Sequence, residues 1–95
     1  MRSRSTSASA ERVEDDLVAA IRDDLRTQAD PSIAAGQQAY MKSAMPFLGV
    51  RVPAARRIAQ SHGRSIRDAD ELRHAALTLW DEARFREERY AALAL

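Results

Sequence analysis

The sequence predicts an all-α fold of about five helices arranged as antiparallel hairpins. Apolar residues in every periodic segment recur at the 3.6-residue spacing of a helix, and no segment alternates between apolar and polar as a strand would. Aromatic residues make up only 5% of the 95-residue chain, while alanine is abundant. Bulk in the core must therefore come from Leu, Ile and Val, between Ala-rich helices that pack closely.

The first predicted helix covers residues 10–29. It follows a basic, Ser-rich segment at residues 1–9, which we interpret as a disordered tail. Its apolar residues recur at every fourth position and form one stripe: Val13, Leu17, Ile21 and Leu25. Acidic residues near the helix start are favourable because the positive end of the helix dipole lies there.

A second helix is predicted from Pro31 to about Ala44. Asp30 can cap this helix, and proline is favoured at the first helical position. Residues 45–52 form a connector without helical or strand periodicity, in which we expect Gly49 to supply a positive φ.

Three further helices are predicted: residues 53–62, about 70–80, and one that begins near Arg84. Proline opens the first of these, and Gly63 ends it. The second fits the template of a helix with one buried face through five residues: Leu72, Ala75, Ala76, Leu79 and Trp80.

The order of these helices suggests how they pair. We expect the first and second helices to form one hairpin, the third and fourth another, and the fifth to begin a third. A spacing of about 40 residues between hairpins is in the range of HEAT-type repeats. Residues 10–95 are therefore interpreted as HEAT-like repeats, an α-solenoid fragment, although a compact bundle stays an alternative. We expect the domain to continue beyond residue 95, because the last residues, RYAALAL, contain no helix stop.

Charge is distributed unevenly although the net charge is only +1. Residues 11–30 sum to −4 and residues 68–95 to −3, whereas residues 31–67 sum to +6 and contain no carboxylate. The cations of this middle segment are Lys42, Arg51, Arg56, Arg57, Arg64 and Arg67. Such a segment is either a solvated face or a surface that faces phosphate groups.

The composition excludes several classes of site. The absence of cysteine excludes disulfides and thiolate chemistry and suits a cytoplasmic location. Two histidines are too few to indicate a metal site, so we expect neither a metal nor a cofactor. No apolar run approaches the ~20 residues of a membrane span, so we expect no membrane partner.

Two segments resemble the bacterial DNA alkylation repair proteins of the AlkD type. In "AYMKSAMPFLGVRVPAARRI" the matching residues are Tyr40, Met41, Lys42, Phe47, Leu48, Gly49, Val50, Pro53, Arg56 and Arg57. In "LTLWDEARFREERYAALAL" they are Leu79, Trp80, Arg86, Glu87, Arg89, Tyr90, Ala91 and Ala92. The segments stand in the order and spacing of that family, and the resemblance covers about residues 11–95. Val52 departs from the family, which commonly has a polar residue before the proline.

The resemblance implies a HEAT-like solenoid whose basic concave face holds duplex DNA. Such proteins are monomeric DNA glycosylases that release N3- and N7-alkylated purines in base excision repair, and they are nucleoid-associated when bound to DNA. The family uses tryptophans and an aspartate on later helices, so we expect no catalytic residue within residues 1–95. The residues expected at the DNA or the lesion are Tyr40, Lys42, Arg51, Arg56 and Arg57.

Each of these residues also has a structural interpretation. Tyr40 is either a core aromatic or a ring placed against the lesion, and Lys42 is either a solvated lysine or a phosphate contact. We expect Trp80 in the core and His62 as a partner of the helix C-terminus. Two alternatives to the glycosylase stay open: a non-catalytic HEAT-like module that binds DNA or protein, and a small helical adaptor that is complete at 95 residues.

Overall fold

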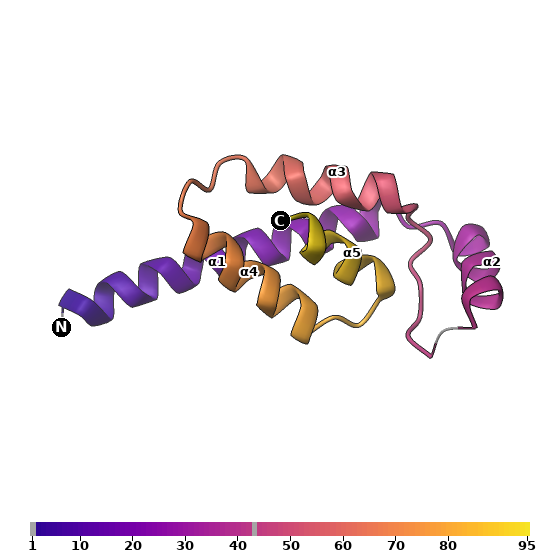
Figure 1. Cartoon of the computed structure of the whole chain (residues 1–95), viewed down its shortest axis with the longest axis horizontal. Helices are drawn as coiled ribbons and strands as arrows, with labels where there is room; N and C mark the ends of the chain where they lie inside the picture. The colour runs from indigo at the N-terminus through magenta and orange to yellow at the C-terminus, as the bar shows by residue number, and fades with distance from the viewer. Residues whose placement is uncertain (1, 43) are drawn as a thin grey trace.

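A computed structural model describes the chain over residues 2–42 and 44–95, with side chains from residue 14 onward. Within these ranges the chain forms five helices and no strand, and its principal extents are 51 × 23 × 19 Å (Figure 1). The helices are α1 (Arg2–Thr27), α2 (Pro31–Met41), α3 (Val52–Gly63), α4 (Ala69–Asp81) and α5 (Arg86–Ala94). The predicted all-α class and the number of helices are confirmed.

Helix α1 begins at Arg2, upstream of the predicted start at residue 10. The structure thus places the segment predicted as a disordered tail in the same helix. The stretch from Arg2 to Thr27 contains neither glycine nor proline, and extending an existing helix by one residue is far easier than starting one. Val13, the first residue of the predicted stripe, lies outside the described side chains.

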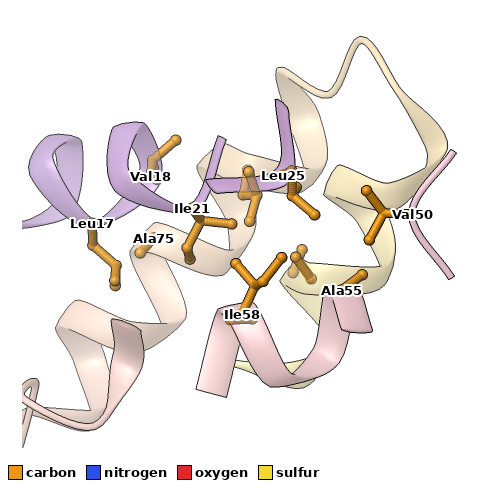
Figure 2. Close-up of a cluster of buried hydrophobic side chains, with 12 residues drawn as sticks. Leu17, Val18, Ile21, Leu25, Val50, Ala55, Ile58 and Ala75 are labelled. Atoms are coloured by element: carbon orange, nitrogen blue, oxygen red, sulfur yellow. The ribbon is translucent and has the colours of Figure 1, made fainter. Parts of the chain in front are cut away.

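The core lies where α1, α3, α4 and α5 meet. Figure 2 shows Ile21 and Leu25 of α1 pointing toward Ile58 and Ala55 of α3, with Val50 of the connector at one end. Leu17, Ile21 and Leu25 of the predicted stripe are all buried. Periodicity predicts four inward residues on α3: Ala55, Ile58 and Ala59 are buried, whereas His62 is only partly buried. The twelve buried residues of this core are Leu17, Val18, Ile21, Leu25, Val50, Ala55, Ile58, Ala59, Ala75, Leu79, Ala91 and Ala92. Five of them are alanines, which let helix backbones approach closely.

The pairing of helices differs from the predicted hairpins. Helix α1 packs against α3, α4 and α5, while α5 packs against α3 and α4. Helix α2 stands apart at one end of the molecule, and none of its residues is buried (Figure 1). The predicted α1–α2 hairpin is therefore wrong, because α2 has no apolar stripe with which to cover α1. Helix α5 packs against α1 instead, and its small residues Ala91 and Ala92 are buried. The predicted α3–α4 hairpin is wrong as well, since α3 and α4 pack mainly against α1 and α5 and not against each other.

The helix ends follow the local chemistry of the sequence. Asp30 caps α2 by accepting the Ser32 N–H at 3.0 Å, and Pro31 is the first helical residue, as predicted. In α3 the N-cap is Arg51 rather than Val52, and no side chain caps this helix. The first N–H groups of α3 consequently have no side-chain acceptor from the cap residue.

Candidate nucleic-acid interface

The connector before α3 is held by a buried carboxylate of α5. The side chain of Glu87 is fully buried, and its oxygens accept three consecutive backbone N–H groups. The distances are 3.0 Å from Leu48, 2.8 Å from Gly49 and 3.0 Å from Val50. Gly49 has φ +93°, which confirms the predicted positive φ and lets three N–H groups converge on one carboxylate.

Neighbouring hydrogen bonds complete the attachment of the connector. The Arg86 N–H donates to the Pro46 carbonyl at 2.9 Å, and the Asp30 N–H donates to the Leu48 carbonyl at 3.0 Å. The start of α2, the connector and the start of α5 are therefore one hydrogen-bonded unit. These hydrogen bonds fix the backbone of the connector, and Arg51 follows it directly at the surface.

A second buried carboxylate, Glu88, ties α5 to α1. It accepts the backbone N–H groups of Arg84 at 2.7 Å and Phe85 at 2.9 Å, and it receives the Arg22 Nε at 2.8 Å. Its charge is thus compensated by an arginine and by the N-terminus of α5. Neither glutamate was expected to be structural. The available signal was two adjacent acids within a segment otherwise predicted as an apolar helix.

An open hollow lies between α2 and the connector, with a volume of about 420 Å³. It is lined by Ser32, Ile33, Gly36, Gln37, Tyr40, Met41, Phe47 and Arg51. Tyr40 is 86% exposed, so the alternative that placed it in the core is wrong. The side-chain oxygen of Gln37 is buried and has no hydrogen-bond partner. The hollow therefore offers an exposed ring, an amide and a guanidinium.

The remaining predicted site residues lie outside this hollow. Lys42 follows the last residue of α2 in a left-handed conformation, with φ +50°, and is exposed. Arg56 and Arg57 are exposed on the side of α3 that faces away from the buried Ala55 and Ile58. The structure thus brings Tyr40 and Arg51 to one hollow and places the other arginines along the solvent face of α3.

The cations of the middle segment differ from those of the flanking segments in their ion pairing. Among the ion pairs of the described residues, none involves a member of this set: Lys42, Arg51, Arg56, Arg57, Arg64 and Arg67. All six are exposed. By contrast, Arg22 and Arg73, from the flanking acidic segments, both form ion pairs. We name the six residues the basic set.

The pKa values of two aspartates, Asp30 before α2 and Asp24 on α1, are lower than usual. Hydrogen bonds from Ser32, with a smaller effect of the nearby Arg51, hold the pKa of Asp30 below its ordinary value. Hydrogen bonds from the Gln28 and His62 side chains likewise lower the pKa of Asp24. His62 Nε2 lies 3.0 Å from an Asp24 carboxylate oxygen, so this histidine joins α3 to α1. His62 also lies in the last turn of α3, as its predicted role at the helix C-terminus requires, but its contact with Asp24 was not predicted.

Trp80 occupies a position that differs from the prediction. Leu79 is fully buried, as expected, but Trp80 is 37% exposed. The Arg89 guanidinium lies over the Trp80 ring, 4.7 Å from its centroid. Trp80 thus belongs to the surface of the α4–α5 pair and is covered on one side by a cation.

Neither a metal cluster nor a membrane helix was found in the part of the chain that the structure describes. No group of three or more His, Asp or Glu side chains is placed there to hold a metal ion. None of the helices in the same ranges is long and apolar enough to cross a bilayer.

Comparison with known protein families gives a match to the greater part of the chain. The sequence model of a protein family described as "DNA alkylation repair enzyme" matches residues 21–95. This range contains α2 to α5, the connector and both buried glutamates. Searches of curated proteins and of solved structures returned no match to the chain.

Proposed function

Because this chain belongs to the family of DNA alkylation repair enzymes, we propose that it binds duplex DNA as part of an alkylpurine DNA glycosylase. The substrate would be DNA that carries N3- or N7-alkylated purines. The single observation that carries the DNA-binding part is the basic set, six exposed cations without ion-pair partners among the described residues.

The basic set suits the DNA backbone because its charges are available. An arginine already paired with a carboxylate must break that pair before it can bind phosphate, whereas Arg56 and Arg57 need not. Each phosphate that a cation neutralises releases counterions, so affinity falls steeply as salt rises. The start of α3 adds N–H groups that no side chain of the cap residue occupies, beside Arg51.

Tyr40 suits the alkylated base. N3- and N7-alkylated purines carry a positive charge, and the face of an aromatic ring attracts cations. The Tyr40 ring is exposed at the rim of the hollow that also contains Gln37 and Arg51. An alkylated purine against this ring would therefore have an amide and a guanidinium within the same hollow.

The proposed reaction is hydrolysis of the N-glycosidic bond. The bond between C1′ and the purine nitrogen breaks, and the alkylated purine leaves as a neutral base with the bonding electron pair. Water supplies the oxygen that bonds to C1′ and loses one proton to the solvent. The leaving group needs no proton, so the protein must stabilise the cationic sugar and position the water. We assign no residue of this chain to those steps; the tryptophans and the aspartate implied by the resemblance would come from helices beyond residue 95.

A second candidate function is a non-catalytic DNA-binding module. The lining of the hollow around Tyr40 includes no carboxylate that could stabilise the sugar or activate water, so the described residues supply a binding surface and not the catalytic group. Both candidates share the DNA-binding surface and differ only in base release.

One DNA substrate can distinguish the glycosylase from the non-catalytic module. A duplex with a single N7-methylguanine is incubated with this chain and, separately, with the product of the complete gene. Binding is measured by fluorescence anisotropy and free base by chromatography. The glycosylase proposal expects salt-dependent binding by the chain and base release above the spontaneous rate by the gene product. Binding without release would favour the module, and the absence of both would contradict the proposed function.

A further inference from the structure

One amide in the hollow beside Tyr40 lacks a hydrogen-bond partner. The side-chain oxygen of Gln37 is buried, and no donor among the described residues reaches it. A buried acceptor without a donor costs free energy, because it has given up its hydrogen bonds to water. Gln37 lines the hollow of about 420 Å³ between α2 and the connector. A ligand in this hollow can supply the missing donor.

One face of α2 forms most of the hollow. Five of the lining residues recur at the three- and four-residue intervals of a helix and therefore share one side of α2. They are Ile33, Gly36, Gln37, Tyr40 and Met41. The whole lining falls between residues 32 and 51, in a part of the sequence that α3, α4 and α5 follow. Figure 1 shows α2 at one end of the molecule and the C-terminus near its middle.

Gly36 leaves room for a flat ring beside Tyr40. A Cβ added at Gly36 would meet no atom within 4 Å, so the space over this residue is open. Gly36 lies about one turn before Tyr40, whose side chain is 86% exposed. A purine laid against the Tyr40 ring therefore meets no side chain at position 36 and shares the hollow with the Gln37 amide.

The chemistry of an alkylated purine matches this amide. Adenine carries N–H donors at N6, and guanine carries them at N1 and N2. Alkylation at N3 or N7 places a positive charge on the ring, and a hydrogen bond with one charged partner is roughly twice as strong as a neutral one. The terminal torsion of a glutamine side chain is broad, so the amide can turn its oxygen toward such a donor. An unmodified purine offers only the weaker, neutral donor.

We propose that Gln37 distinguishes an alkylated purine from an unmodified one. Its amide oxygen accepts a hydrogen bond from an N–H group of an unpaired, cationic purine that lies against Tyr40. The basic set binds the DNA backbone whatever the bases are, so the Gln37 contact adds preference for the lesion and not general affinity. This inference rests on the proposed function, because it takes the substrate to be alkylated DNA.

Two duplexes that differ at one base test the role of Gln37. One carries N7-methylguanine and the other guanine, each opposite an abasic position so that the base is unpaired. The ratio of the two dissociation constants, measured by fluorescence anisotropy, gives the lesion preference. Gln37→Met removes the oxygen and should lower this preference about tenfold, because a hydrogen bond to a charged group is lost. Gln37→Glu keeps an acceptor and should retain the preference.

Gln60→Met is the matched control. It makes the same chemical change at an exposed position of α3 outside the hollow and should leave the lesion preference unchanged. Gly36→Leu supplies an independent variant, because its side chain fills the open space beside Tyr40 while leucine favours the helix. This variant should lose the lesion preference and keep the circular dichroism spectrum of the wild type.

The stability of Gln37→Met separates lesion recognition from a structural role. A side chain that only supported α2 would, when replaced, lower the midpoint of urea unfolding. We expect the midpoint to stay the same or to rise, because the substitution removes a buried oxygen without a partner. Methionine also favours a helix about as well as glutamine does.

Several outcomes would overturn the inference and leave the proposed function intact. One is a wild type that binds both duplexes equally well. Others are a Gln37→Met variant with the lesion preference of the wild type, or a Gln37→Glu variant with no more preference than Gln37→Met. A wild type that binds neither duplex would instead contradict the proposed function, and the inference with it.

Discussion

Glu87 of α5 accepts a hydrogen bond of 2.8 Å from the backbone N–H of Gly49, a residue 38 positions earlier in the chain. The two residues belong to the two segments that resemble the alkylation repair proteins. Their contact shows that these segments form one structural unit, in which a buried carboxylate of α5 holds the connector between α2 and α3. The unit positions Arg51, a member of the basic set, at the surface.

Glu87→Gln should strongly destabilise the fold. The carboxylate accepts three backbone N–H groups in a fully buried position, whereas an amide has one oxygen and presents its own N–H donors to them. We expect a loss of about 3 kcal/mol or more in the free energy of unfolding, measured by urea denaturation. Glu82→Gln is the control. Its side chain is 63% exposed, and the change should cost less than about 1 kcal/mol. Equal effects of the two substitutions would contradict the role of Glu87.

Substitution of two glycines by alanine should have opposite effects. At Gly49 the backbone has φ +93°, and an added Cβ would clash with the Asp30 carbonyl oxygen, so Gly49→Ala should destabilise the protein. At Gly36, inside α2, an added Cβ meets no atom within 4 Å. Gly36→Ala should therefore stabilise the protein by up to about 1 kcal/mol, because alanine favours the helix. Thermal unfolding of both variants checks the pair, and a neutral Gly49→Ala would contradict the described turn.

Acid should weaken the fold in part through Asp24. Its pKa is lower in the folded state because the Gln28 and His62 side chains stabilise the carboxylate. A depressed pKa contributes stability that is fully present above the unfolded pKa of about 3.9 and is lost as pH falls through the folded pKa. Asp24→Asn should therefore be less stable than the wild type at pH 7, and the difference should shrink below about pH 4.

Denaturation at a series of pH values measures this difference. Asp23→Asn is the matched control, because the Asp23 side chain is exposed and makes no described ion pair with a cation. It should leave the pH profile close to that of the wild type. A difference between Asp24→Asn and wild type that stays constant from pH 3 to pH 7 would refute the proposed contribution.

Tyr40→Ala should reduce DNA affinity without unfolding the protein. The ring is 86% exposed, so its removal should change stability by no more than about 0.5 kcal/mol. Loss of stacking with one base corresponds to about 1–3 kcal/mol of binding free energy. Anisotropy with an alkylated duplex measures the affinity. Tyr40→Phe keeps the ring and should bind DNA with the affinity of the wild type. If Tyr40→Ala also binds with that affinity, Tyr40 does not contact the base.

The sequence predicts local features of this fold well. The α class, the cap at Asp30, the positive φ of Gly49 and the buried stripe that includes Ile21 all depend on neighbouring residues, and all are confirmed. The partners of each helix were not predictable in the same way. Periodicity shows that a helix has an apolar side but not which helix covers it, so the expected α1–α2 hairpin is absent from the described residues and α5 fills the place.

The candidate site could be predicted only in part. Charge counting finds the basic set, since an acid-free segment is visible in the sequence. It cannot tell whether a nearby helix supplies carboxylates, and the structure shows that no described ion pair does. The hydrogen bonds of Glu87 join residues that are 37 to 39 positions apart in the sequence, and contacts at that separation cannot be predicted from local patterns.

The central claim is that the cations of the basic set, which form none of the ion pairs of the described residues, bind DNA phosphates. It is tested most directly by the salt dependence of duplex binding for the wild type and for the triple variant Arg51→Gln, Arg56→Gln, Arg57→Gln. Each lost phosphate contact should make the slope of log affinity against log salt shallower by about 0.9. We predict a slope shallower by about 2 to 3 and an unchanged circular dichroism spectrum. An identical slope for the two proteins would contradict the claim.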